Sequence, residues 1–284
     1  MMTASTWTVL PADPYRAQQV ADACGVPHVV GQILLNRGLR HPTQARRFLH
    51  PQLEALTDPF QLPDLPQALH RIHQAIRKNE SVVVFGDSDV DGITAATIVS
   101  ECLRSLGARV AVRLSNRIAD GYGFPPSLIK PLARAGVGLL ILVDCGTNQP
   151  DEVQALAKTG LDVIILDHHV PSARIAKPIA LVNPRLGAGS GQELCSAGLA
   201  AKLAHTLYGQ TDERWCRLLD LVALGTLADY APLVGDNRIF VAMGLEQIAQ
   251  SPRPGLRRLC ESVGATGTSA EQILRRLVPR LNAA

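Results

Sequence analysis

Short apolar runs and longer segments with the apolar spacing of a helix alternate along most of the chain from about residue 65 onward. The runs that we expect to form strands span residues 81–85, 109–114, 139–143, 163–166 and 179–182. The expected helices span residues 69–78, 94–106, 127–135, 150–159 and 197–208. Strands that alternate with helices predict an α/β fold, a parallel sheet flanked by helices. In such sheets the polar loops at the carboxyl ends of the strands form the functional site.

The two ends of the chain differ from this central pattern. Residues 1–75 contain eight prolines and short helical patterns. One such pattern spans residues 32–38 and ends at Gly38, and Thr43 is expected to cap a further helix. We expect a small helical N-terminal segment there, followed by the main domain at 76–245. Residues 246–284 hold six arginines against two glutamates between 253 and 280, and we expect a basic helical segment.

Composition narrows the class of protein without identifying it. The chain is 46% hydrophobic and has no apolar run long enough to cross a membrane. The first residues lack the charged, apolar and small-residue order of a signal peptide, so we expect a cytoplasmic protein with no membrane partner. The six cysteines form no C-x-x-C pair, which disfavours a structural zinc site. A net charge of +3 permits nucleic-acid binding but does not indicate it.

Three carboxylates alternate in a glycine-bounded turn just after the first expected strand: Asp87, Asp89 and Asp91. Carboxylates so close together stay ionised only when cations lie between them. A calcium loop of the EF-hand type is the competing interpretation. It is disfavoured because its twelfth position is Ile98 rather than a glutamate, and because a strand precedes the turn. A solvated acidic turn is the remaining alternative.

Three further polar motifs lie at the ends of apolar runs. We expect these three motifs, like the turn with Asp87, Asp89 and Asp91, to follow strands directly. They contain Asp144, then Asp167-His168-His169, and then Asp229 after the uncharged run 221–228. Asp144 taken alone is also typical of a helix cap, and paired histidines also occur on surfaces. Asp167 can hold an imidazole in one tautomer by accepting its second N–H. An oxygen-rich set with few imidazoles suits Mn²⁺ or Mg²⁺ better than Zn²⁺.

In this order and spacing, Asp-x-Asp-x-Asp-Gly, Asp-Cys-Gly, Asp-His-His and Gly-Thr-Leu-Ala-Asp resemble the motifs of the DHH phosphoesterase superfamily. Within it, segments 34–38, 48–51, 120–124, 236–238 and 279–283 resemble the RecJ family of 5′-to-3′ single-strand-specific DNA exonucleases. One position and one short segment depart from the pattern of the superfamily. Phe85 stands where other branches have a metal-binding histidine, and residues 147–150 differ from the usual sequence after the second motif.

The resemblance implies a site with two Mn²⁺ or Mg²⁺ ions that hydrolyses phosphodiester bonds. The implied metal ligands are Asp87, Asp89, Asp91, Asp144, His168 and Asp229. Asp144 would bridge the ions. His169, assisted by Asp167, would face the scissile phosphate. The residues expected to touch the substrate are Arg117, Arg280 and Asn282.

The resemblance also implies a substrate and partners. Single-stranded DNA is the expected substrate in recombination and repair, with single-strand-binding protein and a helicase as expected partners. Family members continue into a second domain (DHHA1), so we expect this chain to be the N-terminal catalytic part only. Two alternatives stay open: a DHH-type phosphodiesterase for oligonucleotides or cyclic dinucleotides, and an inactive fragment or scaffold that retains the fold.

Overall fold

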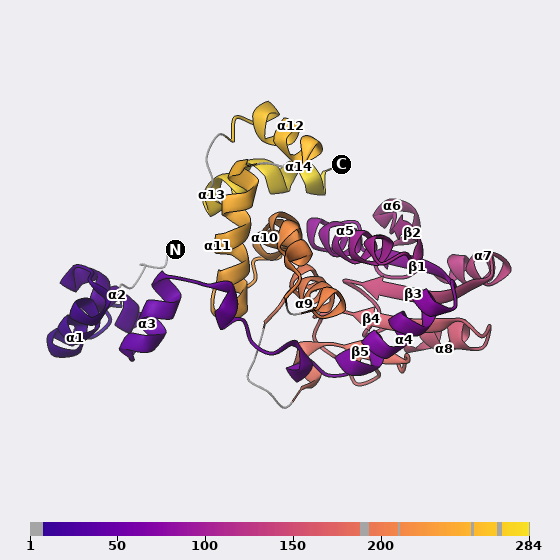
Figure 1. The fold of residues 1–284 in the computed structure, drawn as a ribbon, viewed down its shortest axis with the longest axis horizontal. Helices are drawn as coiled ribbons and strands as arrows, with labels where there is room; N and C mark the ends of the chain where they lie inside the picture. Colours follow the sequence, from indigo (N-terminus) through magenta and orange to yellow (C-terminus); the bar gives the residue numbers. More distant parts are fainter. Residues whose placement is uncertain (1–7, 188–192, 210, 251–252, 266–268, 284) are drawn as a thin grey trace, which may run out of the picture. The chain divides into compact units, whose positions relative to one another are not determined.

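The computed structural model describes residues 8–187, 193–209, 211–250, 253–265 and 269–283, with the exception of the side chain of Asp120. The chain divides into two compact units, Met1–Ala55 and Leu56–Ala284, which are described separately (Figure 1). Among the described residues, no helix has the length and apolar character needed to span a membrane.

The smaller unit consists of three short helices around a small apolar core. They are α1 (Pro14–Cys24), α2 (His28–Asn36) and α3 (Pro42–Leu49), followed by the turn η1 (Leu53–Ala55). Val20, Leu34 and Ala45 form the buried centre, one from each helix. The expectation that Thr43 caps α3 was wrong. The helix already begins at Pro42, whose fixed φ suits the first helical position, and His41 precedes it.

The larger unit is an α/β domain with a five-stranded sheet. Its strands are β1 (Ser81–Gly86), β2 (Arg109–Leu114), β3 (Val137–Val143), β4 (Asp162–Leu166) and β5 (Ala180–Val182). Its helices and helical turns are η2 (Pro59–Gln61), α4 (Leu65–Arg77), α5 (Val90–Ser105), α6 (Arg117–Asp120), η3 (Pro126–Leu128), α7 (Ile129–Arg134), α8 (Pro150–Ala157), η4 (Pro184–Leu186), α9 (Ser196–Tyr208), η5 (Glu213–Leu218), α10 (Leu219–Ala228), α11 (Gly235–Gln250), α12 (Pro254–Ser262), α13 (Ala270–Gln272), η6 (Ile273–Leu277) and α14 (Val278–Asn282).

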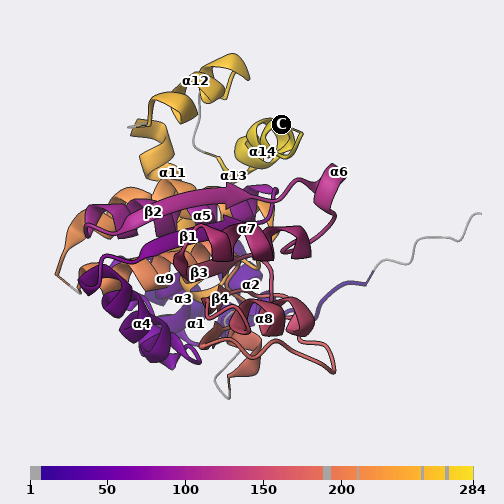
Figure 2. The same ribbon diagram turned by 90° about the vertical axis from the view of Figure 1, so that its right-hand side faces the viewer.

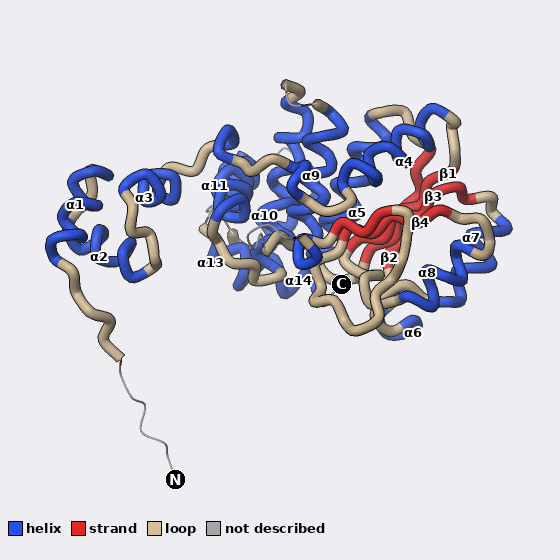
Figure 3. Tube along the Cα trace, turned by 90° about the horizontal axis from the view of Figure 1, so that it is seen from below, coloured by secondary structure: helices blue, strands red, loops and turns tan. Residues whose placement is uncertain are grey.

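The sheet is entirely parallel, in the order β2-β1-β3-β4-β5, which confirms the expected fold class. Alternate residues of β1 face opposite sides. Val83 and Phe85 belong to the core that also contains Leu132 of α7 and Leu156 of α8. A Cβ on Gly86, which points the other way, would lie 3.1 Å from Cβ of Ala96 in α5. Figure 3 shows the strands between α4 on one side and α7 and α8 on the other.

Two of the four motifs differ from the expected local structure. Helix α5 begins at Val90 rather than near residue 94, because Asp89 caps it by accepting from the N–H of Gly92. Asp91 therefore lies in a first helical turn. Asp229 follows helix α10, so the expectation that every motif follows a strand was wrong. An apolar run of this length does not distinguish a buried strand from a buried helix.

Two ion-pair networks fix helices within the larger unit. Lys202 of α9 pairs with Asp236 of α11 at 2.6 Å, with both side chains almost fully buried, and Asp236 also accepts from the hydroxyl of Thr57. Arg253, just before α12, pairs at 2.7 Å with both Glu101 of α5 and Asp220 of α10. The second network binds the C-terminal helices to the body of the domain.

Candidate metal centre and active site

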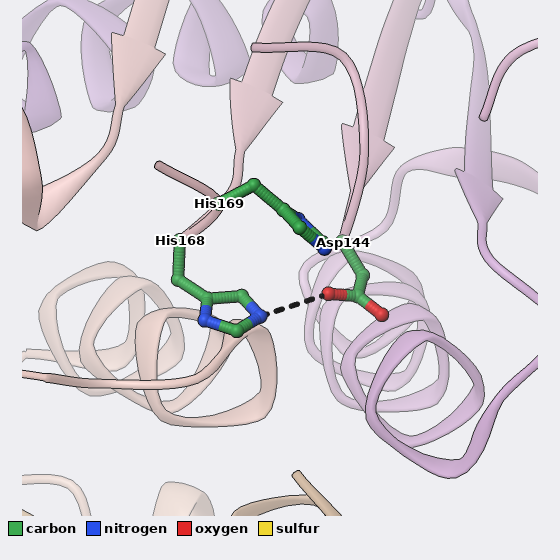
Figure 4. A group of neighbouring side chains, drawn as sticks. All are labelled: Asp144, His168 and His169. Carbon is green, nitrogen blue, oxygen red and sulfur yellow. Dashed lines mark ion pairs between the residues drawn. The ribbon is translucent and has the colours of Figure 1, made fainter. Parts of the chain in front are cut away.

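Three adjacent strands end at the site. Asp87 follows β1, Asp144 follows β3, and the Asp-His-His segment that begins at Asp167 follows β4. Because parallel strands end at the same edge of a sheet, residues far apart in the sequence meet there. Figure 4 shows Asp144 and the paired histidines pointing toward a common space. Asp229 joins them from the end of α10.

His168 lies at the centre of a group of carboxylates. Its Nε2 lies 3.3 Å from Oδ1 of Asp144 and 3.7 Å from Oδ2 of Asp91. Its Nδ1 lies 3.7 Å from Oδ2 of Asp229. Asp91, His168 and Asp229 offer ligand atoms within 4.8 Å of one another. Asp144, His168 and His169 form a second such group.

Two of these carboxylates are buried close together. Asp91 and Asp144 are each only 2% exposed. Burial raises the pKa of Asp91, although His168 and the N–H of Ala197 oppose the shift. Burial, with repulsion from Asp91 and Asp89, raises the pKa of Asp144 well above its ordinary value. A cation between these groups would restore the ionised forms, so the site fits a divalent metal ion with oxygen and imidazole ligands.

Helix α9 supports this pair of carboxylates with its N-terminus. The backbone N–H groups of Ser196 and Ala197 donate to the two oxygens of Asp91 at 2.7 and 2.8 Å. The hydroxyl of Ser196 donates to Oδ1 of Asp144 at 3.0 Å. A helix N-terminus favours negative charge, so α9 partly offsets the cost of burying both aspartates. Ser196 was not predicted from the sequence, where its only signal is a small polar residue at the start of a helix.

Gly225 of α10 allows the helices to approach this centre closely. A Cβ at this position would lie 2.9 Å from Oδ1 of Asp91 and 2.5 Å from Oγ1 of Thr94. Any larger residue would therefore displace α10 or the Asp91 carboxylate. The same helix carries the backbone to Asp229 at its end.

Asp87 contacts donors of its own chain with both carboxylate oxygens. Oδ1 accepts from the hydroxyl of Ser115 at 2.7 Å, and Oδ2 accepts from Nη2 of Arg117 at 2.6 Å. Arg117 also lies 3.9 Å from Asp89. Asp87, Asp89 and Asp144 nonetheless form a third group whose ligand atoms lie within 4.8 Å of one another. Asp89 is more accessible than Asp87, with 40% of its side chain exposed against 1% for Asp87.

His169 lies between a carboxylate and a phenol. Its Nδ1 is 2.7 Å from Oδ1 of Asp167, and its Nε2 is 2.9 Å from the hydroxyl of Tyr122. The hydrogen bond with Asp167 raises the pKa of His169 above its ordinary value. Burial opposes ionisation of Asp167, but hydrogen bonds from His169 and Thr147 hold its pKa at about 2. Asp167 is thus a permanent acceptor that favours the protonated imidazole.

Side chains of the following segment hold the two histidines by their backbone. The buried amide of Asn183 donates to the carbonyl of His169 at 3.0 Å, and Nε of Arg185 donates to the carbonyl of His168 at 2.8 Å. Neither residue was predicted from the sequence. Their types are common in loops, and only the fold brings the segment after β5 to the end of β4.

The two C-terminal residues expected to touch substrate have different contacts. Asn282 accepts at 3.0 Å from the backbone N–H of Val90, the first residue of α5, and so contacts the segment that carries Asp89 and Asp91. Nη1 of Arg280 donates to the carbonyl of Arg276 within the same C-terminal segment. The structure thus brings Asn282, but not the Arg280 guanidinium, to the segment that carries Asp89 and Asp91.

A parallel α/β sheet with this cluster of carboxylates and histidines at its carboxyl edge defines the class of protein. The model of the "DHH family, N-terminal domain" matches residues 81–226, just over half of the chain. The chain therefore belongs to the DHH family.

The chain is similar in sequence and structure to RecJ proteins. The chain is 34% identical over 281 residues to the single-stranded-DNA-specific exonuclease RecJ of Bacillus subtilis, covering 98% of this chain and 35% of that protein. The structure of Thermus thermophilus RecJ in complex with Mn²⁺ matches with a TM-score of 0.83 at 30% identity, covering 96% of this chain and 39% of that one. The Mg²⁺ complex of the same protein matches with a TM-score of 0.71 at 29% identity, covering 96% and 36%. The chain thus spans well under half the length of these relatives.

Proposed function

We propose that this chain carries the catalytic centre of a metal-dependent phosphodiesterase that degrades single-stranded DNA from the 5′ end. It would be a hydrolase acting on ester bonds, with two Mn²⁺ or Mg²⁺ ions. The observation that carries the proposal is the meeting of Asp91, Asp144 and Asp229 around His168 at the edge of the sheet. The similarity to RecJ proteins over nearly the whole chain supports the choice of substrate.

The proposed ligands divide into two sets that share Asp144. Asp91, His168 and Asp229 surround one position, and Asp89 with Asp87 flanks the other. Asp87 accepts one hydrogen bond on each oxygen, from Ser115 and from Arg117, and each oxygen keeps a second lone pair that could bind an ion. When bound, paired ions activate a water molecule and stabilise the attacking and leaving oxygens of an in-line displacement.

His169 would contribute a positive charge beside the metal ligands. Asp167 fixes Nδ1 and, through this hydrogen bond, raises the pKa of the imidazole, which favours its protonated form. Nε2 lies at the hydroxyl of Tyr122, so the protonated ring would stabilise the charge of a nearby phosphate rather than donate a proton directly to the leaving oxygen. Asp167 thus assists through His169 and does not need to touch the substrate.

Arg117 is the proposed contact to substrate phosphate. Its side chain is 57% exposed, while Asp87 fixes one end of the guanidinium beside the site. Asn282 would act on the metal-binding loop, and Arg280 would reach DNA only after releasing Arg276. A cytoplasmic location, and association with single-strand-binding protein and a helicase, belong to this proposal as well.

The test compares substrates on the purified chain with Mn²⁺. We expect metal-dependent release of nucleotides from 5′-labelled single strands, no release from blunt duplex, and no activity in Asp144→Asn. Asp151→Asn, an exposed aspartate paired with Arg174, is the matched control. Preferential hydrolysis of dinucleotides or cyclic dinucleotides would favour the small-substrate alternative. Binding of Mn²⁺ without hydrolysis of any of these substrates would overturn the assignment of activity to this chain.

A further inference from the structure

The segment from Gly121 to Phe124 crosses the site but has no role in the function proposed above. Phe124 anchors it. Its ring is buried and packs edge-on against Phe85, with 5.1 Å between centroids. The amide of Gln149 holds the backbone of Phe124 at both ends, accepting from its N–H at 2.8 Å and donating to its carbonyl at 3.0 Å. Phe85 and Gln149 thus fix one segment.

The anchored segment makes a tight turn that presents one side chain. Gly121 and Gly123 have φ values of 76° and 82°, which residues with a Cβ rarely adopt. A Cβ on Gly123 would also lie 2.5 Å from Oε1 of Gln149. Tyr122, between the two glycines, is held out at 57% exposure. This exposed ring is therefore fixed in place by its neighbours rather than by burial.

The hydroxyl of Tyr122 meets the imidazole of His169. It lies 2.9 Å from Nε2 and 3.2 Å from Nδ1, and the two rings are nearly perpendicular at 69°. Asp167 holds the ring at Nδ1 on its other side. An imidazole with one partner can pivot about that hydrogen bond, whereas two partners fix its plane. A catalytic group held in one orientation avoids the cost of orienting it during reaction.

We propose that Tyr122 is a positioning residue that fixes the imidazole of His169 through its hydroxyl. This inference rests on the proposed function, because it assigns Tyr122 a part in the same reaction. The competing explanation is that only the aromatic ring matters, as packing against the histidine. The two differ in what Tyr122→Phe does, because phenylalanine keeps the ring and removes the hydroxyl.

The first measurement is steady-state hydrolysis of a short single strand with Mn²⁺. We expect Tyr122→Phe and Tyr122→Leu to lower kcat by a similar factor of about 3–10, the value of one hydrogen bond, with KM nearly unchanged. Tyr15→Phe, which changes an exposed tyrosine of the smaller unit, should match the unmodified chain. Recovery of full kcat in Tyr122→Phe, with a loss only in Tyr122→Leu, would overturn the proposal.

The second measurement does not need turnover. In protein labelled with ¹⁵N-histidine and loaded with Mg²⁺, the His169 ring nitrogens are assigned by their disappearance in His169→Asn. We expect the ¹⁵N shift of Nε2 to change in Tyr122→Phe and to stay constant in Tyr15→Phe. An unchanged Nε2 shift in Tyr122→Phe would refute the contact. A changed shift in a chain that hydrolyses no substrate would support the contact while the proposed function fails.

Discussion

Arg117 reaches from the segment after β2 to the loop after β1, where Nη2 donates to Oδ2 of Asp87 at 2.6 Å. Asp87 is buried, whereas Arg117 is more than half exposed. The pair therefore fixes one end of the guanidinium of a side chain that is 57% exposed. The negative charge of Asp87 thus holds the positively charged side chain of Arg117 beside the site that is proposed to bind metal ions.

Arg117→Ala should weaken binding of single-stranded DNA. Loss of one charge-assisted hydrogen bond to phosphate costs about 1.5–3 kcal/mol, or roughly tenfold or more in the dissociation constant. The slope of log K against log salt should shrink by about 0.7, the value of one phosphate contact on a single strand. Fluorescence anisotropy of a labelled oligonucleotide at several salt concentrations measures both effects.

Arg174→Ala is the control for this experiment, because Arg174 is also an exposed arginine held by an aspartate, Asp151, at 2.8 Å. Equal loss of affinity in the two variants would mean that Arg117 contributes only general positive charge.

Asp144→Asn should have opposite effects on stability with and without metal. Without metal, the change removes a carboxyl group whose ionised form is disfavoured by burial and by repulsion from Asp91 and Asp89, so the melting temperature should rise by about 2–4 °C for each kcal/mol relieved. Addition of Mn²⁺ should then raise the melting temperature of the unmodified chain but not that of the variant. Differential scanning calorimetry measures both. A variant that is stabilised normally by Mn²⁺ would contradict the central position of Asp144.

Mn²⁺ affinity should fall as the pH is lowered through about 6. Burial raises the pKa of Asp229 to about 6, and its carboxyl must lose a proton before it can bind a metal ion. For this one group, competition with protons lowers affinity about tenfold between pH 7 and pH 5. Isothermal titration calorimetry at both pH values tests this. The part of the pH dependence due to this group should disappear in Asp229→Asn, which should bind more weakly at both pH values.

The same shift predicts the stability of the metal-free chain. The folded state holds the Asp229 proton more tightly than the unfolded state, so it binds more protons between the two pKa values. The stability that Asp229 contributes is therefore fully present below the pKa of this group in the unfolded state. It is lost as the pH rises to the folded-state pKa of about 6. Asp229→Asn should flatten this decline in urea titrations between pH 4 and pH 7. A decline of the same steepness in the variant would assign it to other groups.

Asn282→Ala should weaken the metal site from a distance in the sequence. The change leaves the buried N–H of Val90 without its acceptor, and an unsatisfied buried donor costs about 1–3 kcal/mol. Because the same turn carries Asp91, we expect Mn²⁺ affinity to fall by a factor of about 3–10. Arg280→Ala, which loses a contact only within the C-terminal segment, should leave Mn²⁺ affinity unchanged. Equal losses in both variants would indicate general loosening of that segment.

Much of the fold and the positions of the candidate ligands could be predicted from the sequence. The aliphatic run before Asp144 has the length and composition of a buried strand, and polar residues directly after such runs lie at one edge of a parallel sheet. Placing the Asp-His-His segment beside Asp144 required no more than this rule. The rule fails at Asp229, because the apolar run before it has no periodicity that separates a helix from a strand.

The supporting contacts could not be predicted in this way. Ser196 acts through its backbone N–H as well as its hydroxyl, and a backbone donor leaves no mark in the sequence. Asn282 and Val90 are 192 residues apart, and only the tertiary structure brings them together. The number of arginines between residues 253 and 280 also overestimates the positive charge that is available to a ligand, because Arg253 forms ion pairs with Glu101 and Asp220.

The Arg253 network also limits where the domain can be cut. Asp220 is fully buried in α10, and burial raises its pKa while Arg253 opposes the shift. A shortened protein that stops after α11 would keep every proposed metal ligand and lose the only cation that pairs, among the described residues, with this carboxylate. Removing one partner of a buried ion pair costs about 3–5 kcal/mol. Boundaries drawn around the four motifs alone would therefore yield a destabilised protein, because they leave out a residue outside the site that pairs with a buried carboxylate.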